Sequence, residues 1–267
     1  MGKPELQPVQ APGWRIASLV PSVTELLFAL GLGPWAVART GFCIRPAAAV
    51  RSVPKVGGTK DVNLERLRRL QPTHVIVNVD ENRRETVEQL RRWVPEVIVT
   101  HPCGPEDNLG LLAQMSQAFG AAAGVAARAG ELADELRREL AIPPPGPEQP
   151  ALVLIWKDPW MTVARDTYIA RMLAQVGWRS WPDVEGGLAG AARYPTLAGD
   201  EAWLGRVRAL LLPSEPYRFG PEHVAAAQAL CPAARVHLVD GELLSWYGPR
   251  TAQGLRYLRR LRDRAPT

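Results

Sequence analysis

A long stretch without proline divides this sequence into two similar halves. Proline is frequent elsewhere, with 25 in 267 residues, yet none occurs between Glu106 and Ile142. The stretch is rich in alanine, leucine, glutamate and arginine, which favour helix. At ~1.5 Å per residue, roughly 35 residues of helix extend about 50 Å, more than a crossover between neighbouring strands requires. We therefore predict that one long helix, residues 106–142, joins two lobes.

Each half alternates between short apolar runs and amphipathic segments, the pattern of a parallel α/β unit. This pattern predicts two Rossmann-like lobes with parallel sheets, residues 15–105 and 148–267, joined by a single long backbone helix. A cleft between two such lobes is a preferred ligand site. Residues 1–14 are polar and proline-rich, and we expect a flexible segment there. The predicted strands include Arg15–Val20, Thr73–Val79, Val97–Thr100, Ala151–Trp156, Ala209–Leu212 and Val236–Val239.

The first helix of each half is expected to begin at a polar cap and to end at a glycine. Ser22 and Glu25 form a predicted capping box before a helix that stops by Gly33. Asp166 takes the same place before a helix that stops at Gly177. The equal spacing from cap to glycine indicates an internal duplication.

Composition and motifs exclude several classes of function. The net charge is +5 and the isoelectric point about 9.4. The arginines are dispersed over predicted helix faces, however, so we expect no nucleic-acid partner. No apolar run reaches the roughly 18 residues of a membrane span, so we expect no membrane insertion. Nucleophile elbow, phosphate-binding loop and dinucleotide fingerprint are absent. We therefore predict that the chain is not an enzyme and has no catalytic residues and no cofactor of its own.

Cysteine and histidine give no sign of a metal site. Cys43, Cys103 and Cys231 are far apart and form no CxxC motif, so small buried thiols are the favoured interpretation. The histidines include no HxH or HExxH pair, whereas a protein metal site needs several converging ligands. We therefore predict no metal held directly by the protein. His101 follows a predicted strand and is the histidine expected near the cleft.

Sequence blocks along nearly the whole chain, from about Arg15 onward, resemble one known family. This family is the helical-backbone metal receptors, the periplasmic binding proteins for cobalamin, haem and ferric siderophores. The blocks in the second half resemble its cobalamin-binding-like branch. The resembling blocks are Ile16–Gly31, Val56–Leu67 and Gln71–Val77 in the first half, and Pro159–Thr167, Leu212–Tyr217 and Val239–Gly248 in the second.

The resemblance implies a function as well as a fold. It implies capture of a metal chelate and delivery to the permease of an ABC importer, with cobalamin or another corrinoid expected ahead of a ferric siderophore or haem. The implied location is the periplasm or cell envelope, and a monomer is expected. The first fourteen residues lack the pattern of a secretory signal. This keeps open a cytosolic relative that stores, senses or hands on a chelate, while a cofactor-processing enzyme is the least favoured alternative.

Ligand-contacting residues are expected at the carboxyl ends of the strands, where open α/β sheets bind ligands. Flat aromatic faces suit a corrin, a porphyrin or an aromatic siderophore. For each tryptophan the competing interpretation is packing in a lobe core, and for Ser22 it is a helix cap. The candidate cleft residues are Ser22, Phe42, Lys60, Asn82, Trp156, Trp160, Tyr217, Trp246 and Tyr247.

Two acidic residues are candidates for docking to a permease. Glu65 and Glu201 occupy comparable places before the second helix of each lobe. The resemblance implies that such carboxylates meet arginines of the permease. The competing interpretation is a carboxylate at a helix start that faces the positive end of the helix dipole.

Overall fold

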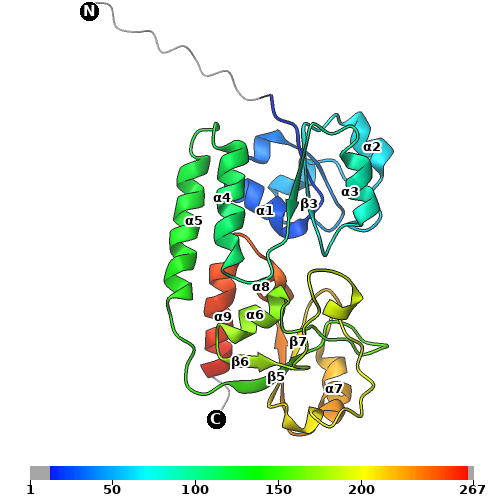
Figure 1. Ribbon diagram of the computed structural model, residues 1–267, viewed down its shortest axis with the longest axis vertical. Helices are drawn as coiled ribbons and strands as arrows, with labels where there is room; N and C mark the ends of the chain where they lie inside the picture. Colours follow the sequence, from blue (N-terminus) through cyan, green and yellow to red (C-terminus); the bar gives the residue numbers. More distant parts are fainter. Residues whose placement is uncertain (1–12, 264–267) are drawn as a thin grey trace, which may run out of the picture.

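Two four-stranded parallel sheets, one in each lobe, form the framework of the protein (Figure 1). This computed structural model describes residues 13–263. The strand order is β2-β1-β3-β4 in the N-terminal sheet and β6-β5-β7-β8 in the C-terminal sheet, so the predicted internal duplication is confirmed. The strands are β1 (Ile16–Ser18), β2 (Ala36–Arg39), β3 (His74–Asn78), β4 (Glu96–Thr100), β5 (Gln149–Val153), β6 (Trp178–Ser180), β7 (Ala209–Pro213) and β8 (Arg235–Val239).

Helices cover both faces of each sheet, as buried parallel strands require. In the central strand β3, Val75 and Val77 pack toward Leu67 on one face, while Ile76 packs toward Met115 on the other. Alternate residues of one strand therefore belong to two different cores. The helices are α1 (Pro21–Ala29), α2 (Leu64–Arg69), α3 (Arg84–Leu90), α4 (Asp107–Phe119), α5 (Val125–Leu140), α6 (Tyr168–Ala174), α7 (Val224–Leu230), α8 (Gly241–Ser245) and α9 (Thr251–Asp263).

The first helix begins earlier than predicted. Helix α1 begins at Pro21, its N-cap residue is Val20, and no side chain caps it. Proline suits the first helical position because its φ is already helical and its missing N–H is not needed there. The predicted capping box of Ser22 and Glu25 is therefore wrong. Glu25 instead forms an ion pair with Arg250 of the other lobe.

The predicted single helix over residues 106–142 is two helices. Helix α4 ends at Phe119, and α5 runs back alongside it after a short turn (Figure 1). Gly124 in this turn has a φ of +82°, which favours glycine. A Cβ atom at Gly120 would lie 2.4 Å from the carbonyl oxygen of Ser116. The chain therefore reverses at a pair of glycines within an otherwise helical sequence.

Helix α5 carries the chain from the N-terminal lobe to the C-terminal lobe. It has 16 residues and is therefore about 24 Å long. It packs against α4 of the N-terminal lobe and against α9 of the C-terminal lobe (Figure 1). Near its end, the buried Glu139 forms ion pairs with Arg256 and Arg259 of α9. A buried carboxylate is tolerated when its charge is compensated, so these pairs fix the end of α5 to the C-terminal lobe.

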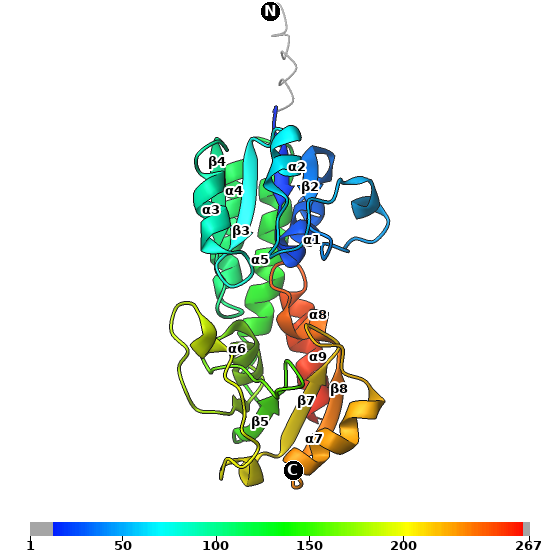
Figure 2. The same ribbon diagram turned by 90° about the vertical axis from the view of Figure 1, so that its right-hand side faces the viewer.

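A second connection between the lobes is the loop from α8 to α9, which reaches the N-terminal lobe (Figure 2). Gly248 in this loop donates its backbone N–H to Oδ1 of Asn108, which is fully buried at the start of α4. Arg250 then pairs with Glu25 in α1. Because the lobes touch at several separate places, we expect hinge motion to be small.

The structure describes neither residues 1–12 nor residues 264–267. Most of the segment 1–14, which is predicted to be flexible, therefore lies outside the described residues. Within residues 13–263, no helix is both long enough and apolar enough to cross a membrane.

Replacing Gly124 with alanine is expected to lower the free energy of unfolding by about 1 kcal/mol, because an L-residue is strained at this positive φ. Gly130, inside α5, is the matched control, since a Cβ atom there meets nothing within 4 Å. Gly130→Ala is expected to raise the free energy of unfolding by about 0.5–1 kcal/mol. Urea unfolding followed by circular dichroism measures both variants. A Gly124→Ala variant as stable as the wild type would contradict the account of the turn.

Candidate ligand site between the lobes

Residues that follow the strands of one lobe contact residues that follow the strands of the other. Asp80, after β3, forms an ion pair with Arg193 of the C-terminal lobe at 3.1 Å. Arg45, after β2, forms an ion pair with Glu242, after β8, at 3.0 Å. The carboxyl ends of the two sheets therefore face each other across the lobe junction, the kind of place where parallel α/β sheets bind ligands.

A cavity of about 440 Å³ lies between the lobes, within the range of roughly 300–1,000 Å³ usual for small-molecule sites. One side is formed by the end of β4 and the first turns of α4, and the other by the start of α6 and the loop before Arg193. Polar residues predominate in the lining. The lining residues are Thr100, His101, Pro102, Cys103, Asp107, Leu111, Gln114, Asp166, Arg171, Gly187, Leu188 and Arg193.

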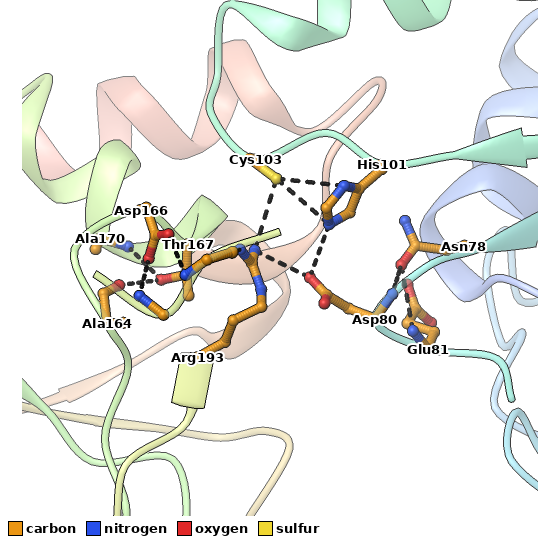
Figure 3. Close-up of polar contacts among 12 residues, drawn as sticks. Asn78, Asp80, Glu81, His101, Cys103, Ala164, Asp166, Thr167, Ala170 and Arg193 are labelled. Atoms are coloured by element: carbon orange, nitrogen blue, oxygen red, sulfur yellow. Dashed lines mark hydrogen bonds and ion pairs between the residues drawn. The ribbon is translucent and has the colours of Figure 1, made fainter. Parts of the chain in front are cut away.

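Arg193 links the two sides of this cavity (Figure 3). Its side chain is only 2% exposed, and Nη2 donates to the carboxylate of Asp80. Nη1 donates to the carbonyl oxygen of Gly187 at 2.6 Å. Removing a guanidinium from water costs several kcal/mol unless its charge is paired. The carboxylate from the opposite lobe therefore stabilises the buried arginine and holds the two lobes in register.

His101 and Cys103 come from the segment that follows β4 (Figure 3). Nε2 of His101 lies 3.4 Å from Sγ of Cys103 and 3.5 Å from the carboxylate of Asp80. Burial raises the pKa of the Cys103 thiol, although the nearby Arg193 acts in the opposite direction. The thiol is therefore protonated at neutral pH, and it is not an activated nucleophile, since the thiolate is the reactive form.

Asp166 holds the loop that borders the cavity in the C-terminal lobe. Its carboxylate accepts the backbone N–H groups of Gly186 and Gly187, each at 2.8 Å. Burial opposes ionisation of this carboxyl, but the backbone donors prevail and lower the pKa of Asp166. The prediction that Asp166 caps the helix is wrong, because Thr167 caps α6. The carboxylate is already used by the loop, and the next hydroxyl takes the cap position.

Glu81 lies at the lobe junction with a strongly shifted pKa. Burial raises the pKa of Glu81 to about 7, while the hydrogen bond from Tyr247 and the charge of Lys60 act in the opposite direction. The hydroxyl of Tyr247 donates to Oε1 of Glu81 at 2.9 Å and belongs to the other lobe. The junction therefore contains a carboxylic acid that gains its charge only near neutral pH.

Three of the predicted cleft residues are exposed near strand ends. Phe42 is 63% exposed and Trp156 is 44% exposed, after β2 and β5 in opposite lobes. Lys60 is also exposed, and its Nζ donates to the carbonyl oxygen of Asp80 at 2.6 Å. The ring of Trp156 meets the ring of Tyr217 edge-on, with centroids 5.4 Å apart. Each lobe therefore carries one aromatic ring that the protein leaves partly uncovered.

Three other predicted cleft residues are buried against the protein. Ser22 lies within α1 and is 3% exposed. Asn82 uses its side chain to hold neighbouring backbone segments, donating to the carbonyl oxygens of Leu19 and Thr59. Tyr247 is buried at the lobe junction. These positions shape the junction without presenting much surface to a ligand.

The remaining aromatic candidates contribute mainly to packing. Trp160 stacks on Phe219 in the C-terminal lobe, with centroids 6.2 Å apart. Tyr217 is half-buried beside the same ring, 4.6 Å away between centroids. Trp246 is buried, and its Nε1 donates to the carboxylate of Glu215. Trp160 and Trp246 therefore pack within the C-terminal lobe, which was the alternative to contact with a ligand.

Several residues around the cavity were not predicted as site residues. Asp80 follows directly after β3, and residues that follow strands were expected at the cleft. Its position in the sequence could therefore have identified it as a candidate site residue. Cys103 lies two residues beyond His101, the histidine that was expected near the cleft and that lines the cavity. Arg193 sits in a long loop without any motif, and only the fold brings it to Asp80.

Comparison with known proteins agrees with this geometry. A family model described as periplasmic binding protein matches residues 16–195, well over half of the chain. The chain belongs to this family. The predicted resemblance to the periplasmic receptors for metal chelates is thereby confirmed, and so is the prediction of a binding protein rather than an enzyme.

Individual relatives of this binding protein support the same fold. The vitamin B12-binding protein of Photorhabdus laumondii is 26% identical over 241 residues, which covers 81% of this chain and 86% of that protein. The structure of the periplasmic vitamin B12-binding protein BtuF of Vibrio cholerae matches with a TM-score of 0.78 and 18% identity, over 94% of this chain and 97% of that one. The periplasmic haem-binding protein HutB of Vibrio cholerae matches with a TM-score of 0.74 and 21% identity, over 93% and 98%. The predicted two-lobe α/β architecture is confirmed.

Within residues 13–263, this binding protein has no group of three or more histidine, cysteine, aspartate or glutamate side chains that could hold a metal ion.

The free energy of unfolding is expected to fall as pH rises from about 5 to about 7, because folded Glu81 keeps its proton until about pH 7. The unfolded chain releases this proton near pH 4.5, so it binds fewer protons in that window. The contribution is on the order of 2 kcal/mol. Glu81→Gln is expected to remove it, which urea unfolding at several pH values measures.

Glu88→Gln is the matched control, because the Glu88 side chain is 53% exposed on α3. The control is expected to keep the pH dependence of the wild type. A Glu81→Gln profile parallel to that of the wild type would show that Glu81 titrates normally in the folded protein.

Proposed function

We propose that this binding protein captures a metal chelate, with a corrinoid as the first candidate, between its lobes and delivers it to the permease of an ABC importer. The observation that carries the proposal is the exposed aromatic ring on each lobe near the facing strand ends, Phe42 and Trp156. Flat rings of this kind suit the faces of a macrocycle. We further propose that the chain acts as a monomer in the periplasm, which fits the family to which it belongs.

The choice of a corrinoid is supported by the relatives. The curated relative from Photorhabdus laumondii is a vitamin B12-binding protein, and the structure of BtuF from Vibrio cholerae shares the fold over nearly the whole chain. The polar lining of the cavity between the lobes agrees with a ligand that carries many hydrogen-bonding side groups.

Haem is the second candidate, because one residue offers a ligand for its iron. The side chain of His101 is 21% exposed and lines the cavity. Imidazole is a common axial ligand of haem iron. A shift of the haem absorption band on mixing, lost in a His101→Ala variant, would favour haem over a corrinoid.

Tryptophan fluorescence titrated with cobalamin, haem and ferric siderophores is expected to show saturable quenching by at least one of them, with cobalamin first. Trp156→Ala is expected to weaken binding about tenfold, because the loss of one aromatic contact is worth ~1–1.5 kcal/mol. Isothermal titration calorimetry measures the affinity of the variant independently of its fluorescence.

Trp93→Phe serves as the control, because Trp93 lies against Arg68 in the N-terminal lobe, away from the strand ends that face the other lobe. Its affinity is expected to equal that of the wild type. No saturable response to any of these chelates would overturn the proposed function.

Delivery to a permease is proposed to use Glu65 in particular. The side chain of Glu65 is 76% exposed, and its ion pair with Arg69 on the same helix is a surface contact that is easily exchanged. Glu201 accepts the backbone N–H groups of Ala198 and Gly199 at 2.8 and 2.9 Å, so its carboxylate also serves a local turn.

Glu65→Gln is therefore expected to reduce chelate uptake severalfold in cells that depend on this protein, while leaving the chelate affinity of the purified protein unchanged. Glu88→Gln, another exposed carboxylate of the same lobe, is the control and is expected to leave both unchanged. Equal uptake by the two variants would exclude Glu65 as a docking residue.

A further inference from the structure

The cavity between the lobes is lined by two arginines, and each of them has a carboxylate beside it. Arg193 forms its ion pair with Asp80 at 3.1 Å and is buried. Arg171 lies 3.5 Å from the carboxylate of Glu106. Neither Asp80 nor Glu106 belongs to the cavity lining. The cavity therefore offers N–H donors on these arginines but no cation without a nearby carboxylate.

Two carboxylates also line the cavity, and backbone groups are their hydrogen-bond partners. Asp107 accepts the backbone N–H of Cys103 at 2.8 Å. Asp166 accepts the backbone N–H groups of Gly186 and Gly187. Within residues 13–263, neither carboxylate forms an ion pair with a basic side chain. Each oxygen of an ionised carboxylate has two acceptor sites, so both groups keep acceptor capacity.

This distribution of charge discriminates between two kinds of ligand arm. A carboxylate arm would enter beside Asp107 and Asp166, where each arginine already has a carboxylate near it. The excess of carboxylates is unfavourable for a further anion in a partly buried site. A carboxamide arm is neutral, and it has two N–H donors and a carbonyl acceptor. It matches a lining that mixes carboxylate acceptors with arginine donors.

We infer that the cavity receives carboxamide arms of the bound chelate and so selects amide-bearing corrinoids over chelates whose arms are carboxylates. The inference rests on the proposed function and adds the chemical class of ligand that the site accepts. The apolar side chains of Leu111 and Leu188 also line the cavity and suit the hydrocarbon stems of such arms.

A pair of matched ligands tests the selection directly. Cobinamide and cobyrinic acid share the corrin ring and its cobalt, but the first carries amide arms and the second carries carboxylates. We expect the wild-type protein to bind cobinamide at least tenfold more tightly, measured by tryptophan quenching at pH 7.5 and low ionic strength. Low ionic strength keeps charge interactions measurable.

A charge placed in the cavity tests where the selection occurs. Leu188 lines the cavity and is 85% exposed, so a lysine there is not expected to disturb folding. Leu188→Lys supplies an unpaired cation and is expected to reduce the preference for cobinamide at least threefold. Leu238, 45% exposed on β8 and outside the cavity lining, is the matched control. Leu238→Lys adds the same charge and is expected to keep the wild-type preference.

The outcomes separate this inference from the proposed function. Equal affinity of the wild type for the two corrinoids, or tighter binding of cobyrinic acid, would overturn the inference and leave chelate binding standing. A preference for cobinamide that Leu188→Lys leaves unchanged, or that Leu238→Lys reduces equally, would also overturn it. If neither corrinoid, haem nor any ferric siderophore binds, both proposals fail.

Discussion

The arrangement of the lobes depends on the contact between the α8–α9 loop and the start of α4. Asn108 is fully buried, accepts the N–H of Gly248 and donates to the carbonyl oxygen of Pro105. A buried amide left without such partners would cost ~1–3 kcal/mol. Gly248 adopts a φ of +86°, and a Cβ atom there would approach Leu26 of α1 to 3.4 Å. The close approach of the loop sets the spacing at which the facing strand ends meet.

Charged groups at this junction are paired across the lobes. Arg193 meets Asp80, and Arg250 meets Glu25, in each case from opposite lobes. Buried ion pairs add little net stability because desolvation offsets their attraction, but a buried charge without its partner is strongly destabilising. Pairing across the junction therefore favours one arrangement of the lobes. A site that is already arranged loses less free energy to ordering when a ligand binds.

The repeated strand pattern was predictable, whereas the helix between the lobes was not. Runs such as those of β3 and β7 are apolar because both faces of a parallel sheet are covered, so they are visible without a structure. The turn at Gly120 and Gly124 interrupts a segment that is otherwise strongly helical. Glycine within a helical pattern marks either a weak helix or a break. The choice between them depends on the packing of α5 against α4, a tertiary contact that helix propensity does not report.

The sequence alone determined the two parallel sheets and the placement of aromatic side chains at strand ends, because these follow from local patterns of apolar residues. The family was indicated by the resemblance of several sequence blocks to known receptors. Phe42 and Trp156 are examples of such positions. Tertiary structure decided which polar groups share the cavity. Asp80 and Arg193 are separated by more than a hundred residues and show no common motif. The folded chain brings them together because a buried guanidinium requires a carboxylate, wherever in the sequence that carboxylate lies.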